Sequence, residues 1–227
     1  MKNSKKQNGI FITGTDTDVG KTYIGKQIVS LLYEINVSIL PRKPIESGCE
    51  LMNDQLRPAD ASYYYDAVDK NIPLTDICPF RFQPSISPQR AARLVKQPIT
   101  TQEVKDVCLK NCTSDDFLFV EGAGGFYSPL CEDGLNADLA KALQLPVMLI
   151  AKDQLGCINH ILLTADAIQK MGLTLCAVIL NRKDVTHDDA MDNLDDLKKY
   201  FEIPIYLVSH NELIKNNKTL VDFITNL

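Results

Sequence analysis

The residues Gly20, Lys21 and Thr22 have the types and the order of a phosphate-binding loop. An apolar run at residues 10–13 precedes the loop, and a helical pattern follows it. Backbone N–H groups of such a loop point at phosphate oxygens, beside a helix N-terminus whose partial positive charge favours anions. In a P-loop, the lysine reaches the terminal phosphates and the Ser or Thr hydroxyl binds Mg²⁺. The sequence therefore predicts a nucleotide-phosphate site, although Thr15 stands where the strict pattern has glycine.

Strand-like apolar runs alternate with helical stretches along the whole chain. We predict strands at residues 10–14, 38–42, 117–121, 147–151, 174–181 and 205–208, and helices at residues 21–34, 59–67, 88–95, 101–111, 137–143, 158–171, 188–200 and 219–226. This alternation predicts an α/β fold with a mostly parallel sheet and helices on both faces. We expect a single P-loop (Rossmann-like) domain over residues 1–227, with residues 1–8 as a frayed basic tail. The proline-rich segment 72–97 is expected to wrap the surface or to shape a site.

Four polar residues lie at or just past the carboxyl ends of predicted strands. They are Lys21, Lys43, Glu121 and Asn181. In an open parallel sheet, ligands bind beyond this edge of the strands. The topology therefore predicts that the four side chains converge on one site.

The composition indicates a soluble globular protein, with 45% hydrophobic and 23% charged residues. No apolar run reaches the roughly 18 residues that span a membrane, and no secretory signal is visible, so we expect a cytoplasmic protein without a membrane partner. The net charge of −5 argues against nucleic acid as the main partner. The seven scattered cysteines indicate thiols in a reducing compartment. The histidines, His160, His187 and His210, have no triad or metal-ligand spacing.

Four segments, in the right order, resemble the dethiobiotin synthetase family of biotin biosynthesis. They are Gly-Thr-Asp-Thr-Asp-Val-Gly-Lys-Thr at residues 14–22, Arg-Lys-Pro-Ile-Glu-Ser-Gly at 42–48, Val-Glu-Gly-Ala-Gly-Gly at 120–125 and Leu-Gly-Cys-Ile-Asn-His at 155–160. The similarity extends from about residue 9 to residue 181 and weakens afterwards. The resemblance implies that 7,8-diaminononanoate, CO₂ and ATP give dethiobiotin, ADP and phosphate, through a carbamate and a carbamic–phosphoric anhydride. It also implies Mg²⁺ as a cofactor and a homodimer.

Lys21 and Lys43 are the expected catalytic cations. A lysine beside a proline in a turn after a strand is most often solvated, whereas the resemblance implies that Lys43 holds the carbamate and phosphate oxygens. It also implies that Ser47 hydrogen-bonds the same group. No step of this reaction requires an enzyme nucleophile, and none is visible in the sequence. Charge neutralisation and alignment are what the site must supply.

Thr22, Asp60 and Glu121 are the expected Mg²⁺ ligands. Glu121 ends an apolar strand before a glycine-rich turn, where a Walker-B-like acid is expected, although a capping or solvated acid is the alternative. The resemblance implies Asp60 as the second acid. From the sequence alone, Asp60 could instead cap the helix that follows it, and Asp54 and Asp66 compete with it nearby.

The resemblance assigns the remaining positions to the nucleotide or to the substrate. Nucleotide contacts are implied for Asp18, Val19, Gly20, Lys21, Thr22, Tyr23, Asp60, Glu121, Gly122, Ala123, Gly124, Asn181, Arg182, His210 and Asn211. Substrate contacts are implied for Thr17, Ser47, Gly124, Leu155, Gly156, Cys157 and Asn159. Two positions depart from the family, which often has Glu at Asp18 and usually has Asp at Arg182.

Residues 155–159 open a helix whose free N–H groups could bind a carboxylate. In the family, this segment receives the substrate carboxylate of the neighbouring subunit, so the resemblance implies a site shared across a homodimer. Cys157 is expected to fill space rather than to act as a nucleophile. The amide of Asn181 has a donor and an acceptor, which suits the edge of adenine.

Two other classes of protein compete with this interpretation. A partitioning-type ATPase typically has a second lysine inside the loop, and residues 15–19 contain none. An amidotransfer synthetase, such as the cobyrinate family, typically requires an added glutaminase domain, for which 227 residues leave no room.

Overall fold

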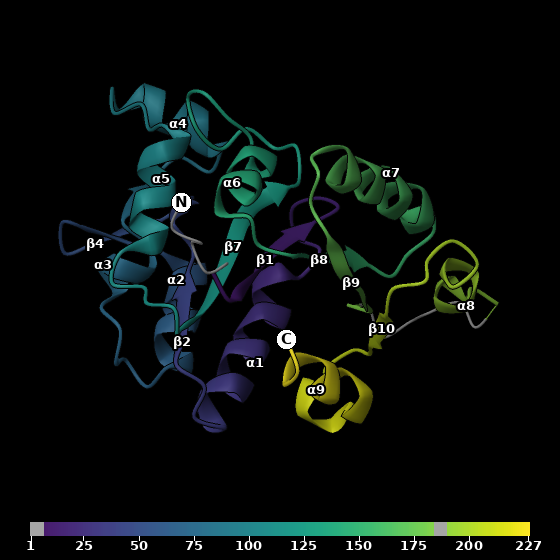
Figure 1. The fold of residues 1–227 in the computed structure, drawn as a ribbon. Helices are drawn as coiled ribbons and strands as arrows, with labels where there is room; N and C mark the ends of the chain where they lie inside the picture. Colours follow the sequence, from purple (N-terminus) through teal and green to yellow (C-terminus); the bar gives the residue numbers. More distant parts are fainter. Residues whose placement is uncertain (1–6, 184–189) are drawn as a thin grey trace, which may run out of the picture.

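The computed structural model describes residues 7–183 and 190–227 (Figure 1). Most of the predicted tail therefore lies outside the described residues, as do His187 and the start of the helix predicted at 188–200. Gln7 and Asn8 are not frayed. The Gln7 amide donates to the Asp116 carbonyl at 3.1 Å, and the Asn8 carbonyl accepts from Leu118 N at 2.9 Å.

A six-stranded sheet forms the centre of the described fold, in the order β10-β9-β8-β1-β7-β2. Every neighbouring pair is parallel, as predicted. The strands are β1 (Gly9–Gly14), β2 (Ile39–Arg42), β7 (Phe117–Gly125), β8 (Val147–Lys152), β9 (Leu175–Asn181) and β10 (Ile205–Val208). The central strand β1 is buried along its whole length, because helices cover both faces of a parallel sheet.

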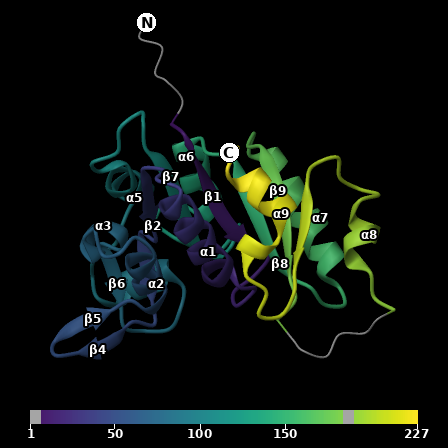
Figure 2. The same ribbon diagram turned by 90° about the horizontal axis from the view of Figure 1, so that it is seen from below.

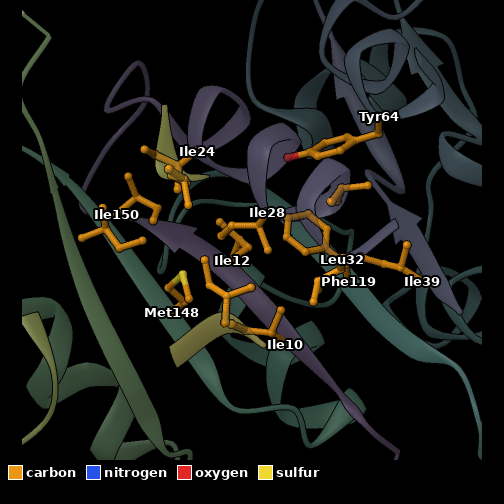
Figure 3. Packing of buried hydrophobic residues seen from close by; sticks show 14 of the residues in the cluster. Ile10, Ile12, Ile24, Ile28, Leu32, Ile39, Tyr64, Phe119, Met148 and Ile150 are labelled. Carbon is orange, nitrogen blue, oxygen red and sulfur yellow. The ribbon is translucent and has the colours of Figure 1, made fainter. Parts of the chain in front are cut away.

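Helices lie on both faces of the sheet (Figure 1). On one face, α1 (Lys21–Glu34), α2 (Ala59–Ala67) and α9 (Lys218–Ile224) pack with Ile10 and Ile12 of β1. On the other face, α4 (Pro88–Leu94), α5 (Thr101–Leu109), α6 (Asn136–Leu143) and α7 (Cys157–Lys170) pack with Phe11. Successive side chains of a strand point to opposite faces, so these neighbouring residues of β1 enter two separate cores. Figure 3 shows the first core.

The structure differs from the predicted elements mainly in short segments. Four strands and a helix were not predicted: β3 (Ile45–Ser47), which pairs with β6 (Phe80–Phe82), the hairpin of β4 (Glu50–Met52) and β5 (Gln55–Arg57), and α3 (Leu74–Ile77). Three or four residues are too few to show a period. In Figure 2 the hairpin projects away from the sheet, beside α2. Its turn residues, Asn53 and Asp54, both have positive φ, which Asn and Asp tolerate in tight hairpin turns.

The last third of the chain is less helical than predicted. In the described residues, the helix expected over 188–200 is reduced to α8 (Asn193–Leu197), and a short 3₁₀ turn, η1 (Ile214–Asn216), precedes α9. In the described part of the chain, no helix is long and apolar enough to cross a membrane.

Candidate active site

A cleft of about 680 Å³ lies at the carboxyl edge of the sheet, where β1, β2 and β7 end. Segments that are distant in sequence line it: the P-loop, the turn after β2, the start of α2, residues 85–88 and the glycine-rich end of β7. Twelve of the predicted site residues are among its lining residues: Thr17, Asp18, Gly20, Lys21, Thr22, Tyr23, Lys43, Ser47, Asp60, Glu121, Ala123 and Gly124. The proline-rich segment contributes Ser85, Ile86, Ser87 and Pro88, so it helps to shape the site.

Two glycines set the course of the P-loop. Gly20, at the N-terminus of α1, has a φ of 97°, and a Cβ there would overlap the side-chain amide of Asn181. A Cβ on Gly14 would lie 2.7 Å from Val19 Cγ2 and 2.8 Å from the Asp16 carbonyl. The loop can therefore close tightly with Gly14 rather than with a glycine one residue later, which accounts for the departure from the strict pattern.

Lys21 is held beneath this loop and is only 6% exposed. Its Nζ donates to the Asp16 carbonyl at 2.9 Å. Burial, and then the charge of Lys43, lowers the pKa of Lys21 to about 8. Lys21 therefore changes its protonation near pH 8 when the cleft holds no nucleotide. Added negative charge in the cleft would favour its ammonium form.

Lys43 directly follows β2, and its side chain contacts the neighbouring strand β7. Since β2 and β7 are paired, Lys43 and Glu121 meet, with Nζ and Oε1 2.5 Å apart. Lys43 Nζ also lies 3.3 Å from Asp60 Oδ2 and 3.0 Å from the Gly122 carbonyl. Burial opposes the charge of Lys43, but Glu121 and then Asp60 outweigh this effect and raise its pKa above the usual lysine value. The alternative of a solvated lysine after the strand is wrong, because Lys43 is buried, and its raised pKa favours the ammonium form.

Hard oxygen donors gather beside this ammonium. Thr22 Oγ1 donates to Glu121 Oε1 at 3.0 Å, and Lys43 links that carboxylate to Asp60. A hydroxyl and two carboxylates suit Mg²⁺, which prefers oxygen ligands and usually takes one or two carboxylates together with substrate phosphates. The residues present therefore fit the cofactor that the resemblance implied.

Glu46 was not predicted as a site residue, although it positions one. Its carboxylate accepts the backbone N–H groups of Asp60 at 2.9 Å and Ala61 at 3.0 Å, and so caps α2. Pro58, at the N-cap position, provides no side-chain cap. The alternative that Asp60 caps this helix is therefore wrong. The contact between Glu46 and α2 is invisible in sequence because the two are 14 residues apart.

Two more buried residues were missed. Tyr64 is fully buried, its hydroxyl donates to Glu121 Oε2, and burial followed by the charge of Glu121 raises its pKa well above the usual value. Asn136, also fully buried, fixes the glycine-rich turn: its amide nitrogen donates to the carbonyls of Ala123 at 2.7 Å and Gly125 at 3.0 Å. Neither residue type has a sequence signature for such a contact.

The predicted nucleotide residues at the end of β9 and beyond it, Asn181, Arg182, His210 and Asn211, do not line the cleft. Asn181 is buried and its amide nitrogen donates to the Val19 carbonyl at 3.0 Å, so it ties β9 to the P-loop. Arg182 forms an ion pair with Asp153 at 3.0 Å. His210 and Asn211 lie in the loop after β10, where His210 Nδ1 contacts the Lys183 carbonyl. Lys183, which was not predicted, does line the cleft, and its Nζ donates to the Asp18 carbonyl at 2.7 Å.

The predicted substrate residues at the start of α7 also lie outside the lining of the cleft. Gly156 caps the helix with a φ of 88°, and Cys157 is buried, as expected for a residue that fills space. Leu155 is 91% exposed and Asn159 is exposed. Val19 and Gly122 are likewise absent from the lining, because both are buried behind it. All seven cysteines are free thiols.

Comparison with curated proteins identifies the family. A protein from Pseudoalteromonas translucida named ATP-dependent dethiobiotin synthetase BioD is 38% identical over 201 residues, which cover 88% of this chain and 88% of that one. A protein of the same name from Ruthia magnifica is 34% identical over 205 residues, covering 90% and 92% of the two chains. The chain belongs to the dethiobiotin synthetase family. A family profile described as an AAA domain matches residues 8–214 of this synthetase-family chain.

The fold of this dethiobiotin synthetase family member is similar to that of several solved structures. MinD in the MinC:MinD cell division protein complex of Aquifex aeolicus aligns with a TM-score of 0.60 at 14% identity, over 96% of this chain and 95% of that one. A ParA family ATPase from Chlorobium tepidum aligns with a TM-score of 0.58 at 16% identity, over 97% and 100%. These similarities concern the fold alone. They confirm the predicted P-loop α/β architecture.

Proposed function

We propose that this protein catalyses the ATP-dependent carboxylation and ring closure of 7,8-diaminononanoate with CO₂, giving dethiobiotin, ADP and phosphate in biotin biosynthesis. The observation that carries the proposal is the meeting of Lys21, Lys43, Thr22 and Glu121 in one cleft of a dethiobiotin synthetase family chain. We place the reaction in the cytoplasm and in a homodimer. The chemistry needs two cations, a metal and alignment, and this cleft contains the groups for each.

The reaction proceeds in three balanced steps. One amine of the substrate attacks CO₂ and loses a proton, which gives a carbamate. A carbamate oxygen then attacks the γ-phosphorus, the bond to ADP breaks, and a carbamic–phosphoric anhydride forms. The second amine attacks the carbonyl carbon, loses a proton and expels phosphate, which closes the five-membered urea ring. The protein contributes no nucleophile, so its groups act by orientation and by charge.

Lys21 and Lys43 divide the negative charge between them. Lys21, under the loop, neutralises the terminal phosphates of ATP, as the lysine of a P-loop does. Lys43 holds the carbamate and the transferring phosphoryl oxygens, since its ammonium is buried, fully charged and fixed by Glu121 and Asp60. A preorganised cation of this kind stabilises charge as it develops in the transition state.

Thr22, Asp60 and Glu121 are the residues that would hold Mg²⁺. The ion supplies charge neutralisation at the phosphate oxygens when it is bound. Lys43 contacts both carboxylates and so links Asp60 to Glu121 beside the cleft.

The substrate contacts come from two chains. Thr17, Ser47 and Gly124 border the cleft and bind the diamine end of the substrate. Residues 155–159 of the neighbouring subunit receive the substrate carboxylate at the N-terminus of α7, where free N–H groups favour an anion. Leu155, just before this helix, and Asn159, in its first turn, are both exposed, which supports such an arrangement. The nucleotide lies along the P-loop and Gly122–Gly124, and its base reaches Asn181, Arg182, His210 and Asn211.

The test is ATP turnover with all combinations of the diamine and bicarbonate. We expect ADP release only when both are present, in equal amounts with dethiobiotin. Lys43→Ala is the matched control and should release neither product. Rapid ADP release without the diamine would indicate a nucleotide switch instead and would refute the proposal.

A further inference from the structure

Tyr64 is a buried tyrosine whose hydroxyl is hydrogen-bonded to the carboxylate of Glu121. It lies on α2 one turn after Asp60, and its hydroxyl donates to Glu121 Oε2. The other oxygen, Oε1, accepts from Lys43 Nζ at 2.5 Å and from Thr22 Oγ1 at 3.0 Å. Each oxygen of the carboxylate therefore has its own donors, and the plane of the carboxylate is fixed from two sides.

Gly25 leaves the space through which this phenol reaches Glu121. It is buried in the second turn of α1, and inside a helix glycine is the least favourable residue after proline. A Cβ at this position would overlap the Tyr64 hydroxyl and would lie 2.9 Å from Phe119 Cζ. The helix α1 therefore has glycine, which lowers its stability, at the position where a larger residue would collide with the Tyr64 hydroxyl.

The ring of Tyr64 is held by packing. Its centroid lies 5.4 Å from that of Phe119, at an interplanar angle of 53°. Figure 3 shows both rings within the core on the α1 face of the sheet. Phe119 precedes Glu121 by two residues on β7, so the two side chains point to the same face of the sheet. The same strand thus presents the packing partner and the hydrogen-bond acceptor of Tyr64.

We propose that Tyr64 is a positioning residue that holds Glu121 Oε2 so that Oε1 faces Thr22 and the cleft, and that Gly25 makes this contact possible. The inference rests on the proposed function, in which Glu121 is a Mg²⁺ ligand. Hydrogen-bond partners of a metal-ligating carboxylate orient it, and their loss lowers metal affinity or activity by roughly 10–100-fold. Tyr64 acts through Glu121 and touches neither substrate nor metal.

The experiment compares ADP binding to Tyr64→Phe and to the parent chain by calorimetry, with Mg²⁺ and with EDTA. Tyr64→Phe retains the ring and removes only the donor. We expect MgADP to bind roughly 10-fold more weakly, and ADP in EDTA to bind as in the parent. The Mg²⁺ concentration for half-maximal turnover should rise by a similar factor, with an unchanged KM for the diamine.

Two further variants separate positioning from packing. Tyr63→Phe changes an exposed tyrosine of the same helix and should alter none of these values. Gly25→Ala should reproduce the Mg²⁺-dependent defect, because its methyl group displaces the Tyr64 hydroxyl. The double variant with Tyr64→Phe should bind MgADP no more weakly than either single variant, since both changes remove the same hydrogen bond.

The outcomes distinguish the two levels of the proposal. If the parent chain binds ADP equally well with Mg²⁺ and with EDTA, the metal assignment of the proposed function fails. If the parent depends on Mg²⁺ and Tyr64→Phe matches it in both MgADP affinity and Mg²⁺ requirement, only the positioning inference is overturned. If Tyr64→Phe also loses ADP binding in EDTA, the residue supports the cleft as a whole, and the inference is likewise wrong.

Discussion

Nucleotide binding should change the protonation of Lys21, whose pKa burial and the charge of Lys43 lower to about 8. At pH 8.5 the ratio of neutral to charged lysine is then about 3 to 1, so about three quarters of the molecules have a neutral Lys21. The phosphates of a bound nucleotide favour the ammonium form. Binding at pH 8.5 should therefore take up about 0.75 proton per site, against about 0.1 at pH 7.

Calorimetric titration with MgADP, in two buffers of different ionisation enthalpy, measures this uptake. The difference in apparent binding enthalpy between the buffers gives the number of protons exchanged. Lys21→Arg is the matched control, because a guanidinium stays charged throughout this range and should take up no proton. Equal, near-zero uptake at pH 8.5 in both proteins, with binding retained, would show that Lys21 is already charged and would refute the reasoning.

The lowered pKa of Lys21 also makes the stability of the protein depend on pH. The folded-state pKa of Lys21, about 8, lies below the usual lysine value of 10.5. Below pH 8 both the folded and the unfolded chain bear the charge, and the folded state has the full cost of burying it, about 3 kcal/mol for a difference of about 2.5 between the two pKa values. Between pH 8 and 10.5 the unfolded chain binds more protons, so this cost declines as the pH rises. Lys21→Met should therefore raise the melting temperature of the nucleotide-free protein at pH 7, with a smaller gain at pH 10.

Three further outcomes are expected. Lys43→Ala should keep MgATP binding but lower product formation by about 100-fold or more, measured by calorimetry beside the turnover assay; a parallel collapse of ATP affinity would make Lys43 a nucleotide clamp. Glu46→Gln should lower the free energy of unfolding by about 1 kcal/mol in urea titrations, because an amide has one acceptor oxygen for the two N–H groups at the start of α2; unchanged stability would remove the capping argument. Asn159→Asp should weaken diamine binding and leave ATP binding unchanged, and mixing it with Lys43→Ala should restore part of the activity through hybrid sites. With subunit exchange confirmed, no recovery would mean that each chain builds its site alone.

The six central strands were predictable because each is an apolar run between helical patterns. Burial on both faces of a parallel sheet imposes that composition, and the P-loop, Lys43 and Glu121 meet at one edge of the sheet because the carboxyl ends of parallel strands lie together. The unpredicted elements are those whose pairing is decided by tertiary contacts. The three-residue strand β3 exists because it meets β6, more than thirty residues further along the chain.

The site was predictable where a polar residue directly follows a run of apolar strand residues and enters the cleft, as Lys43 after β2 and Glu121 within β7 do. Glu46, Tyr64 and Asn136 were missed because they act on other site residues through the fold. Each binds a backbone or side-chain group that is distant in sequence, and none belongs to a residue type that signals such a contact. The assignment of Asn181 to the nucleotide base stays a prediction, since its amide nitrogen is bonded to Val19.

The most direct test of the central claim follows oxygen from CO₂ into phosphate. In the proposed reaction the carbamate oxygen attacks the γ-phosphorus, and its bond to carbon breaks when the ring closes. With freshly added C¹⁸O₂ in unlabelled water, and quenching before the label exchanges with solvent, mass spectrometry should find one ¹⁸O in each phosphate released with dethiobiotin. Phosphate without ¹⁸O would mean that water, rather than a carbamate, attacks the nucleotide, and would contradict the account.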